Sequence, residues 1–290
     1  MKRRKRSRWP LVKVPGSEKV PFFNRLIQRS VRPGMDPMLT WGTEVDVSRV
    51  PAFLKDASQR WNIPLSMPAV LIKATGMALA AHPELLYRVV RRRLYRYKRI
   101  SATLAFHNQH RDEADLHFLY DIDKFSCSHI FNILMRDSMR VARGEDPRDP
   151  DKRFLERSGP LMGPIYRSSR FLYNNFHLPD LMGRLGRLQT AVVAINYLAF
   201  AGAPSLRSFK AAQLGSNCGP VHVALGPTEP RPVVEEGQVV VRPVAPLIVR
   251  IDHRVADAVV LGRFVATLQC YLSDPASIPG LEDDVTPDYS

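Results

Sequence analysis

The chain has 290 residues, 45% of them hydrophobic and 24% charged, so it can bury a full core without disulfide bonds. No stretch reaches the ~20 consecutive apolar residues that a membrane-spanning helix needs. The three cysteines lie far apart, which is typical of a reducing compartment and argues against a structural metal site. We therefore expect a soluble cytoplasmic protein with no bound metal.

The net charge is +14 and is concentrated in two clusters, over residues 1–13 and 88–99. Such clusters attract anions, including nucleic acid, phospholipid and phosphorylated ligands. The first predicts a basic arm that is either a solvated tail or in contact with an anionic membrane surface, with a nucleic-acid role as the alternative. In the second, tyrosines lie among the arginines. A solvated face, a subunit contact, a phosphate-attracting rim or a stacking surface for bases would each explain it, but no known nucleic-acid-binding motif accompanies it.

The hydrophobic pattern predicts a mixture of helices and strands. In chain order we expect a basic arm over 1–35, a strand at 43–48, helices at 51–62 and 67–82, strands at 100–106 and 116–122, a helix at 125–142, broken helical pieces over 154–188, strands at 190–195 and 221–225, a hairpin at 233–241 with Gly237 in its turn, a strand at 246–251, and a helix that ends near 273. Because the strands and helices do not alternate regularly, we expect one α+β domain over 36–275, followed by a tail over 276–290.

The strongest chemical signal is the segment Ile251-Asp-His-Arg-Val-Ala-Asp-Ala258. It places His253 where a strand ends and a helix begins, and imidazole is well suited to accept a proton at neutral pH. Asp257 follows four residues later, and we expect it to form an ion pair with Arg254 or Arg250 that fixes the loop. A purely structural His–Asp pair is the alternative explanation of this spacing.

The residues around this segment resemble the catalytic domain of the dihydrolipoamide acyltransferases of 2-oxoacid dehydrogenase complexes, whose fold is shared with chloramphenicol acetyltransferase. The family signature, a strand, DHRxxDG and a helix carrying Phe, stands here as IDHRVADAVVLGRF at 251–264. The upstream segment 221–254 is similar to the strands, hairpin and final strand of the family. Near the N-terminus, TEVDVSRV (43–50) and LSMPAVLIKATGMALAAHPEL (65–85) resemble the first strand and a helix that ends in His-Pro-Glu.

The resemblance covers about residues 38–275 and implies a two-layer sandwich of a mixed sheet and helices. It implies that His253 is the general base toward the thiol of coenzyme A or dihydrolipoamide, and that Asp257 holds the geometry of the site. It also implies active sites between neighbouring subunits of a homotrimer. Coenzyme A thioester is then a substrate and no cofactor is bound. On charge alone, we expect Arg91, Arg92 and Arg93 to attract its phosphates.

The sequence departs from the family pattern at two places. Ala258 replaces the glycine that follows the aspartate. Where the family has a Ser or Thr hydroxyl that stabilises the oxyanion, this chain has Ile195 and Asn196, so we assign the oxyanion donor to the Asn196 amide. The alternative is a catalytically impaired subunit with a scaffold or regulatory role. We also find no lipoyl domain, so we expect a free-standing catalytic domain whose acceptor is a small molecule or a separate carrier.

Overall fold

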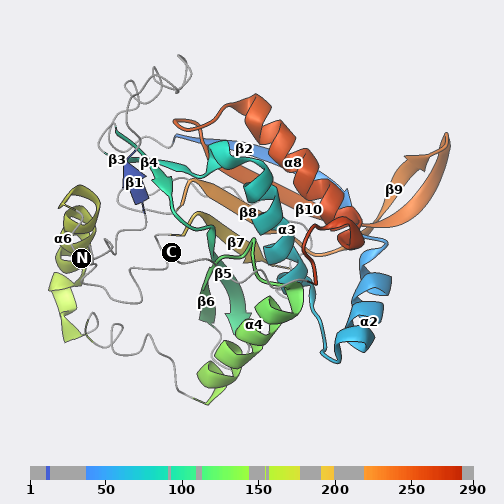
Figure 1. Cartoon of the computed structure of the whole chain (residues 1–290), viewed down its shortest axis with the longest axis horizontal. Coiled ribbons are helices and arrows are strands. Elements are labelled where there is room, and N and C mark those ends of the chain that lie inside the picture. The colour runs from blue at the N-terminus through green and yellow to red at the C-terminus, as the bar shows by residue number, and fades with distance from the viewer. Residues whose placement is uncertain are drawn as a thin grey trace, which may run out of the picture.

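The computed structural model describes residues 11–13, 37–90, 93–108, 113–143, 154, 157–176, 191–198 and 219–282. In this part of the chain, a seven-stranded sheet forms one layer and helices form the other (Figure 1). Six strands lie in the order β2-β10-β8-β7-β5-β6, and β9 pairs with the far end of β10. Their bounds are β2 Met38–Asp46, β5 Ser101–Asn108, β6 Glu113–Tyr120, β7 Val193–Tyr197, β8 Val221–Leu225, β9 Glu229–Glu235 and β10 Gln238–Asp252.

The sheet is mixed because β7 pairs in parallel with both β5 and β8, whereas the other pairs are antiparallel. A parallel pair cannot be closed by a short hairpin turn, so β7 is not joined to β5 or β8 in that way. The predicted α+β sandwich with a mixed sheet is therefore confirmed.

The helical layer covers one face of this sheet. Its members are α2 Val50–Trp61, α3 Met67–Ala81, α4 Cys127–Ala142 and α8 Ala258–Ser273, with the short 3₁₀ turns η1 Pro83–Leu85 and η4 Pro275–Ser277. Helix α3 lies between α4 and α8 and packs against both, which explains why it is apolar on nearly every side (Figure 1). A further 3₁₀ turn and helix, η2 Gly159–Leu161 and α6 Met162–Phe176, follow α4 in the chain.

Two close contacts hold α3 to the end of β6. A Cβ atom at Gly76 would lie 2.7 Å from the backbone of Ile122, so only glycine allows this approach. One turn earlier, Lys73 is 1% exposed, and its Nζ donates to the carbonyl oxygen of Asp123 at 2.8 Å. Hydrogen bonding of this kind is required when an ammonium group leaves water.

A small second sheet was not predicted from the sequence. It has the order β1-β4-β3, formed by β1 Leu11–Lys13, β4 Arg93–Tyr97 and β3 Tyr87–Val90. Tyr95 and Tyr97 are 6% and 4% exposed, so the interpretation of these tyrosines as a stacking surface for bases is wrong. Their alternation with exposed Arg96 and Lys98 is the two-residue period of a strand that buries one face.

Most predicted elements are present within a few residues of their expected bounds. One difference concerns β10, which is a single strand of 15 residues that includes both the second hairpin strand and the predicted strand 246–251. Near the C-terminus, residues of the predicted tail pack on the core: Leu281 is 8% exposed, and its carbonyl oxygen accepts from the backbone N–H of Cys127 at 2.9 Å. None of the described helices has the length and apolar character needed to cross a bilayer.

Candidate active site

His253 lies directly after β10, at a strand end that neighbouring segments hold on both sides. Its backbone N–H donates to the carbonyl oxygen of Pro37, just before β2, at 2.8 Å. The N–H of the preceding residue, Asp252, donates to Pro220, just before β8, also at 2.8 Å. Because β10 is fixed to both neighbours up to its last residue, the backbone of His253 has a defined position.

The turn that follows is closed by Asp252. Its carbonyl oxygen accepts from the N–H groups of Val255 and Ala256, at 2.9 and 3.3 Å. Its carboxylate, 5% exposed as a residue, accepts from the backbone N–H of Arg254 at 2.9 Å and from the Arg254 guanidinium at 2.6 to 3.1 Å. Charge-assisted bonds with both carboxylate oxygens are among the stronger polar contacts in proteins. The turn that presents His253 is therefore well constrained.

This turn also orients the imidazole. Nδ1 of His253 lies 2.9 Å from the carbonyl oxygen of Ala256. A carbonyl oxygen can only accept, so Nδ1 carries the hydrogen, and Nε2 holds the lone pair in the neutral ring. The side chain is half-buried. The arrangement produces the tautomer that a general base requires, with Nε2 as the proton-accepting atom.

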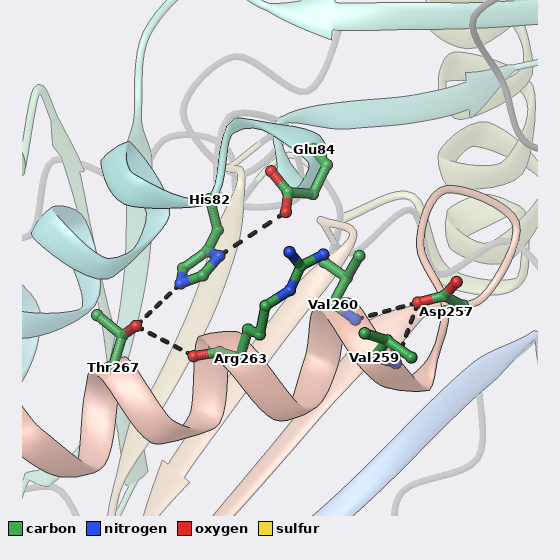
Figure 2. A network of polar contacts seen from close by, with 7 residues as sticks. All are labelled: His82, Glu84, Asp257, Val259, Val260, Arg263 and Thr267. Atoms are coloured by element: carbon green, nitrogen blue, oxygen red, sulfur yellow. Dashed lines mark hydrogen bonds and ion pairs between the residues drawn. The ribbon is translucent and has the colours of Figure 1, made fainter.

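Asp257 begins helix α8 instead of pairing with an arginine of the loop. Its Oδ1 accepts from the N–H groups of Val259 and Val260, both at 3.0 Å (Figure 2). An aspartate at this position satisfies two N–H groups that lack partners within the helix and interacts favourably with the helix dipole. Asp257 therefore fixes where α8 starts, immediately after the turn that carries His253.

The predicted ion pair between Asp257 and Arg254 or Arg250 needs correction. Arg254 pairs with Asp252, which lies two residues before it on the same turn. Arg250, 8% exposed, donates from Nε to Thr40 Oγ1 on β2 at 3.1 Å. The spacing in the sequence suggested Asp257 as the partner of the arginine. In the folded turn, Asp252 is the carboxylate that Arg254 contacts. Both arginines still support the last residues of β10.

Ile195 and Asn196 lie on opposite faces of β7. Ile195 is fully buried in the core cluster, whereas Asn196 is half-buried on the other face. Asn196 lies in register with Ala224 of β8, and Ala224 with Ile248 of β10. Asp252 is four residues farther along β10, so about 14 Å along the strand and about 10 Å across two strands give a separation of about 17 Å. One chain does not bring Asn196 and His253 together.

The predicted phosphate contact cannot be placed. Arg91 and Arg92 lie outside the described residues, and Arg93 begins β4 with no description of its side chain.

Helix α8 also carries a polar contact that the sequence analysis missed. Nε2 of His82, which follows α3, lies 2.9 Å from Thr267 Oγ1 (Figure 2). The Thr267 hydroxyl donates to the carbonyl oxygen of Arg263 at 3.0 Å, so it accepts from His82, and Nε2 of His82 carries the hydrogen. Nδ1 of His82 then faces Glu84 Oε1 at 3.7 Å. In the sequence, the His-Pro-Glu stretch at the end of the predicted helix could have indicated this contact. The contact joins the end of α3 to α8, the helix that follows His253.

Two further observations concern metal binding and cysteine reactivity in the described region. No group of three or more His, Cys, Asp or Glu residues within it is arranged to hold a metal ion. Burial raises the pKa of the Cys127 thiol to about 12, so this cysteine is protonated at neutral pH and is a poor nucleophile.

Comparison with known proteins relates this geometry to a family. Residues 222–279 match the family model described as the catalytic domain of 2-oxoacid dehydrogenases acyltransferase, and the match spans the strands and helix on either side of His253. The dihydrolipoamide acetyltransferase of Azotobacter vinelandii has a similar structure, with a TM-score of 0.61 and 16% identity over 88% of each chain. The chain has the fold of these acyltransferases.

Two further structures extend the comparison. A probable dihydrolipoamide acetyltransferase from Listeria monocytogenes aligns with a TM-score of 0.59 and 15% identity, over 96% of this chain and 97% of that one. A chloramphenicol acetyltransferase aligns with a TM-score of 0.51 and 13% identity, over 86% and 94%. A search among curated protein sequences gives no match. The predicted resemblance to the dihydrolipoamide acyltransferase catalytic domain is thus confirmed by sequence over residues 222–279 and by fold over most of the chain.

Proposed function

We propose that the protein transfers an acyl group between coenzyme A, or another thioester, and a thiol, amine or hydroxyl acceptor, with His253 as the general base. The observation that carries this proposal is the hydrogen bond from His253 Nδ1 to Ala256 O, which leaves the lone pair on Nε2. It occurs at the end of β10, inside the segment that matches the acyltransferase family model.

The chemistry follows from that tautomer. Nε2 takes the proton of the acceptor, and the acceptor's electron pair attacks the thioester carbonyl carbon. The tetrahedral intermediate collapses, the carbon–sulfur bond breaks, and the thiolate of coenzyme A leaves and takes the proton back from Nε2. While the ring is positively charged, the Ala256 carbonyl oxygen stabilises the hydrogen on Nδ1.

Support for the histidine also comes from a related enzyme. In the Azotobacter dihydrolipoamide acetyltransferase, a serine, a histidine and an asparagine four residues after it have been investigated for their role in the catalytic mechanism. His253 and Asp257 have the same spacing here. We propose that Asp257 acts through the start of α8, which it caps, and is a positioning residue.

We propose that the oxyanion donor of each site comes from a different copy of the chain than its His253. Because Asn196 lies about 17 Å from Asp252 in its own chain, its amide is available only to the His253 of another copy. We therefore propose a homo-oligomer with sites between subunits, a homotrimer by analogy with the related acyltransferases. The similar structures include the cubic core of a pyruvate dehydrogenase multienzyme complex, which is itself a symmetric assembly.

Three further expectations complete the proposal. We propose that Arg91, Arg92 and Arg93 contact the phosphates of coenzyme A, that the basic arm over 1–35 reaches an anionic surface, and that the protein works in the cytoplasm.

A second function has one observation in its favour. Ile195 occupies the position of the family's hydroxyl residue and is fully buried in the core, so it offers no hydrogen bond to an oxyanion. Loss of one oxyanion donor costs roughly 10²- to 10³-fold in rate. A protein that kept the fold without fast turnover would serve as a scaffold or regulatory subunit.

One experiment separates these two functions. The purified protein is incubated with a panel of acyl-coenzyme A donors, with dihydrolipoamide and simple amines as acceptors, and products are measured by mass spectrometry. In parallel, its Tm is measured with saturating coenzyme A, because a ligand at 100 times its Kd stabilises a protein by about 2.7 kcal/mol. Turnover supports the enzyme. A rise in Tm without turnover supports the scaffold, and neither response with any donor overturns both coenzyme A proposals.

A further inference from the structure

The outer side of helix α4 carries methionine and arginine side chains and no exposed carboxylate. The exposed residues of α4 and its C-terminal cap are Asn132, Met135, Arg136, Met139, Arg140, Ala142 and Arg143. With about 3.6 residues per turn, these positions all fall on one side of the helix. We call the two methionines and three arginines among them the methionine–arginine stripe.

The stripe is turned away from the core. Met135 and Met139 are 40% and 48% exposed and lie one turn apart, so their side chains are neighbours on the helix surface. Arg136 and Arg140 form a second row beside them, with the same spacing. Figure 1 shows α4 at the margin of the helical layer, on the side of α3 that lies opposite α8.

Other residues of α4 attach the helix to the core. Ile130, Phe131, Leu134 and Val141 are at most 7% exposed and form its inner side. Folding of α4 therefore does not depend on the apolar side chains of Met135 and Met139.

The positive charge of the stripe is only partly compensated. Asp137 is the one carboxylate of α4, and its two oxygens lie 3.6 Å from Nδ1 of His117 and 3.9 Å from Nε of Arg136. Among the residues that the structure describes, Arg140 and Arg143 have no ion-pair partner within 4.0 Å.

The composition of the stripe differs from that of a solvated helix surface. Helix α2 of the same chain has such a surface, where Arg60 pairs with Asp56 one turn before it at 2.9 Å. On α4, Arg136 and Arg140 place like charges one turn apart, which destabilises a helix. The helix dipole favours cations in the last turn only, so it does not account for Arg136. Methionine and arginine are both enriched in protein interfaces, whereas lysine and glutamate are depleted there.

The chemistry of the stripe selects one class of partner. Three arginines favour an acidic surface. Methionine adapts its shape to the apolar side chains of a protein partner, whereas helices that lie on membranes use Trp, Phe and Leu, and surfaces that bind single strands of nucleic acid use aromatic rings. A second copy of this chain carries a net charge of +14 and is repelled.

We propose that the methionine–arginine stripe of α4 docks an acidic amphipathic helix of a different protein. Apolar side chains of that helix pack on the methionines, and its carboxylates pair with the arginines. Because α4 has 16 residues and is about 24 Å long, the contact is smaller than a standard interface, and the association is transient. This docking requires no acyl transfer and so goes beyond the proposed function.

The test uses two fluorescein-labelled synthetic peptides of identical composition, rich in glutamate and leucine. In the first, the leucines lie along one side of a helix and the glutamates flank them. In the second, the same residues are rearranged so that leucines lie all round the helix. Fluorescence anisotropy measures the Kd of each peptide at about 150 mM salt, which screens charges that are not in contact.

Two pairs of substitutions alter the stripe. Met135→Gln/Met139→Gln keeps the length and helix propensity of the side chains but removes their apolar character, and Arg140→Gln/Arg143→Gln removes two positive charges. Circular dichroism and thermal unfolding verify that each variant is folded. The matched control, Lys55→Gln/Arg157→Gln, removes two positive charges from exposed residues outside α4.

We expect the wild type to bind the first peptide about tenfold more tightly than the second, and each stripe variant to lose about tenfold in affinity for it, while the control keeps its affinity. Equal affinity for the two peptides, or an equal loss in the control, would show attraction by net charge alone and overturn the proposal. Absence of binding would overturn it as well. Vesicles of phosphatidylglycerol that bind through the same residues, without discrimination between the peptides, would assign the stripe to a membrane and also overturn it.

A charge reversal guards against loss of binding through misfolding. Arg140→Glu/Arg143→Glu should bind the acidic peptide more weakly and gain about fivefold in affinity for a peptide with lysine in place of glutamate, since a gain cannot come from unfolding. A folded variant without this gain would contradict docking on the stripe. Peptide binding by a protein that shows no acyl transfer would leave the docking intact and count against the proposed function alone.

Discussion

The guanidinium of Arg254 donates to both carboxylate oxygens of Asp252, and this ion pair closes the turn that holds His253. The histidine is thus oriented by its own chain neighbours: Asp252 fixes the turn, and the turn presents the Ala256 carbonyl oxygen to Nδ1. In this arrangement no distant residue is needed to select the tautomer. The first prediction follows from this dependence.

Asp252→Ala leaves the half-buried Arg254 without its carboxylate and removes the acceptor of one backbone N–H. We expect a loss of about 1–3 kcal/mol in the free energy of unfolding, measured with urea. We also expect the His253 ring to lose its preference for hydrogen on Nδ1, which ¹⁵N chemical shifts of labelled histidine detect. Asp252→Asn, which keeps an acceptor oxygen, should retain more of both properties. An unchanged tautomer in the alanine variant would disprove the positioning role.

Asp257 is expected to act through its position at the start of α8. Asp257→Ala removes the acceptor for the N–H groups of Val259 and Val260 and should cost about 1 kcal/mol of stability. Asn is as good a residue at this position as Asp, so Asp257→Asn should keep most of the stability and, if transfer occurs, most of the rate. Thermal unfolding and kcat provide the comparison. A rate that falls as far with Asn as with Ala would show that the negative charge itself is needed.

The pair formed by His117 on β6 and Asp137 on α4 predicts a pH dependence. The side-chain hydrogen bond from His117 lowers the pKa of Asp137 below its usual 3.8, with burial opposing the shift. A lowered folded-state pKa contributes stability that is fully present above pH 3.8 and is lost as the pH falls through the folded value. The stability difference between the wild type and Asp137→Asn should therefore decrease as the pH falls below 4. A difference that grows on acidification would contradict this sign.

The cysteines should differ strongly in reactivity. Cys127 is fully buried with a pKa raised to about 12, whereas Cys270 on α8 is exposed. Iodoacetamide at pH 8 should modify Cys270 in the native protein and Cys127 only after denaturation, as peptide mass spectrometry will show. Rapid native labelling of Cys127 would mean that the start of α4 opens in solution.

The sequence predicted the elements that a regular period defines and missed features that depend on long-range register. Helix α3 and strand β8 follow directly from the spacing of their apolar residues. The small sheet that contains β4 was missed, because its arginines suggested a solvated face while its tyrosines are in fact buried. Strand β10 appeared interrupted because Pro243 and Pro246 lie within it. Both are accommodated there, and Pro243 faces another proline across the hairpin.

In the candidate site, too, features set by the local sequence were predicted and features that depend on the folded structure were not. His253 and its place at a strand end follow from local sequence. The role of Asp257 as the cap of α8 was not predicted, because the spacing suggested an ion pair with Arg254 or Arg250 instead. The partner of Arg254 was assigned incorrectly because turn geometry, and not spacing, decides between Asp252 and Asp257. The separation of Asn196 from His253 depends on the order of β7, β8 and β10, which is not evident in one sequence without the fold.

The most direct test of the account is acyl transfer by His253→Ala beside the wild type, with His129→Ala as a control that removes a histidine of α4 stacked on Phe125. Initial rates with the best donor and acceptor from the panel are measured across pH. We predict that His253→Ala loses about 10³-fold in kcat/KM, within the range for removal of a general base, while His129→Ala keeps its rate. Equal turnover by His253→Ala and the wild type would contradict the assignment of His253 as the base.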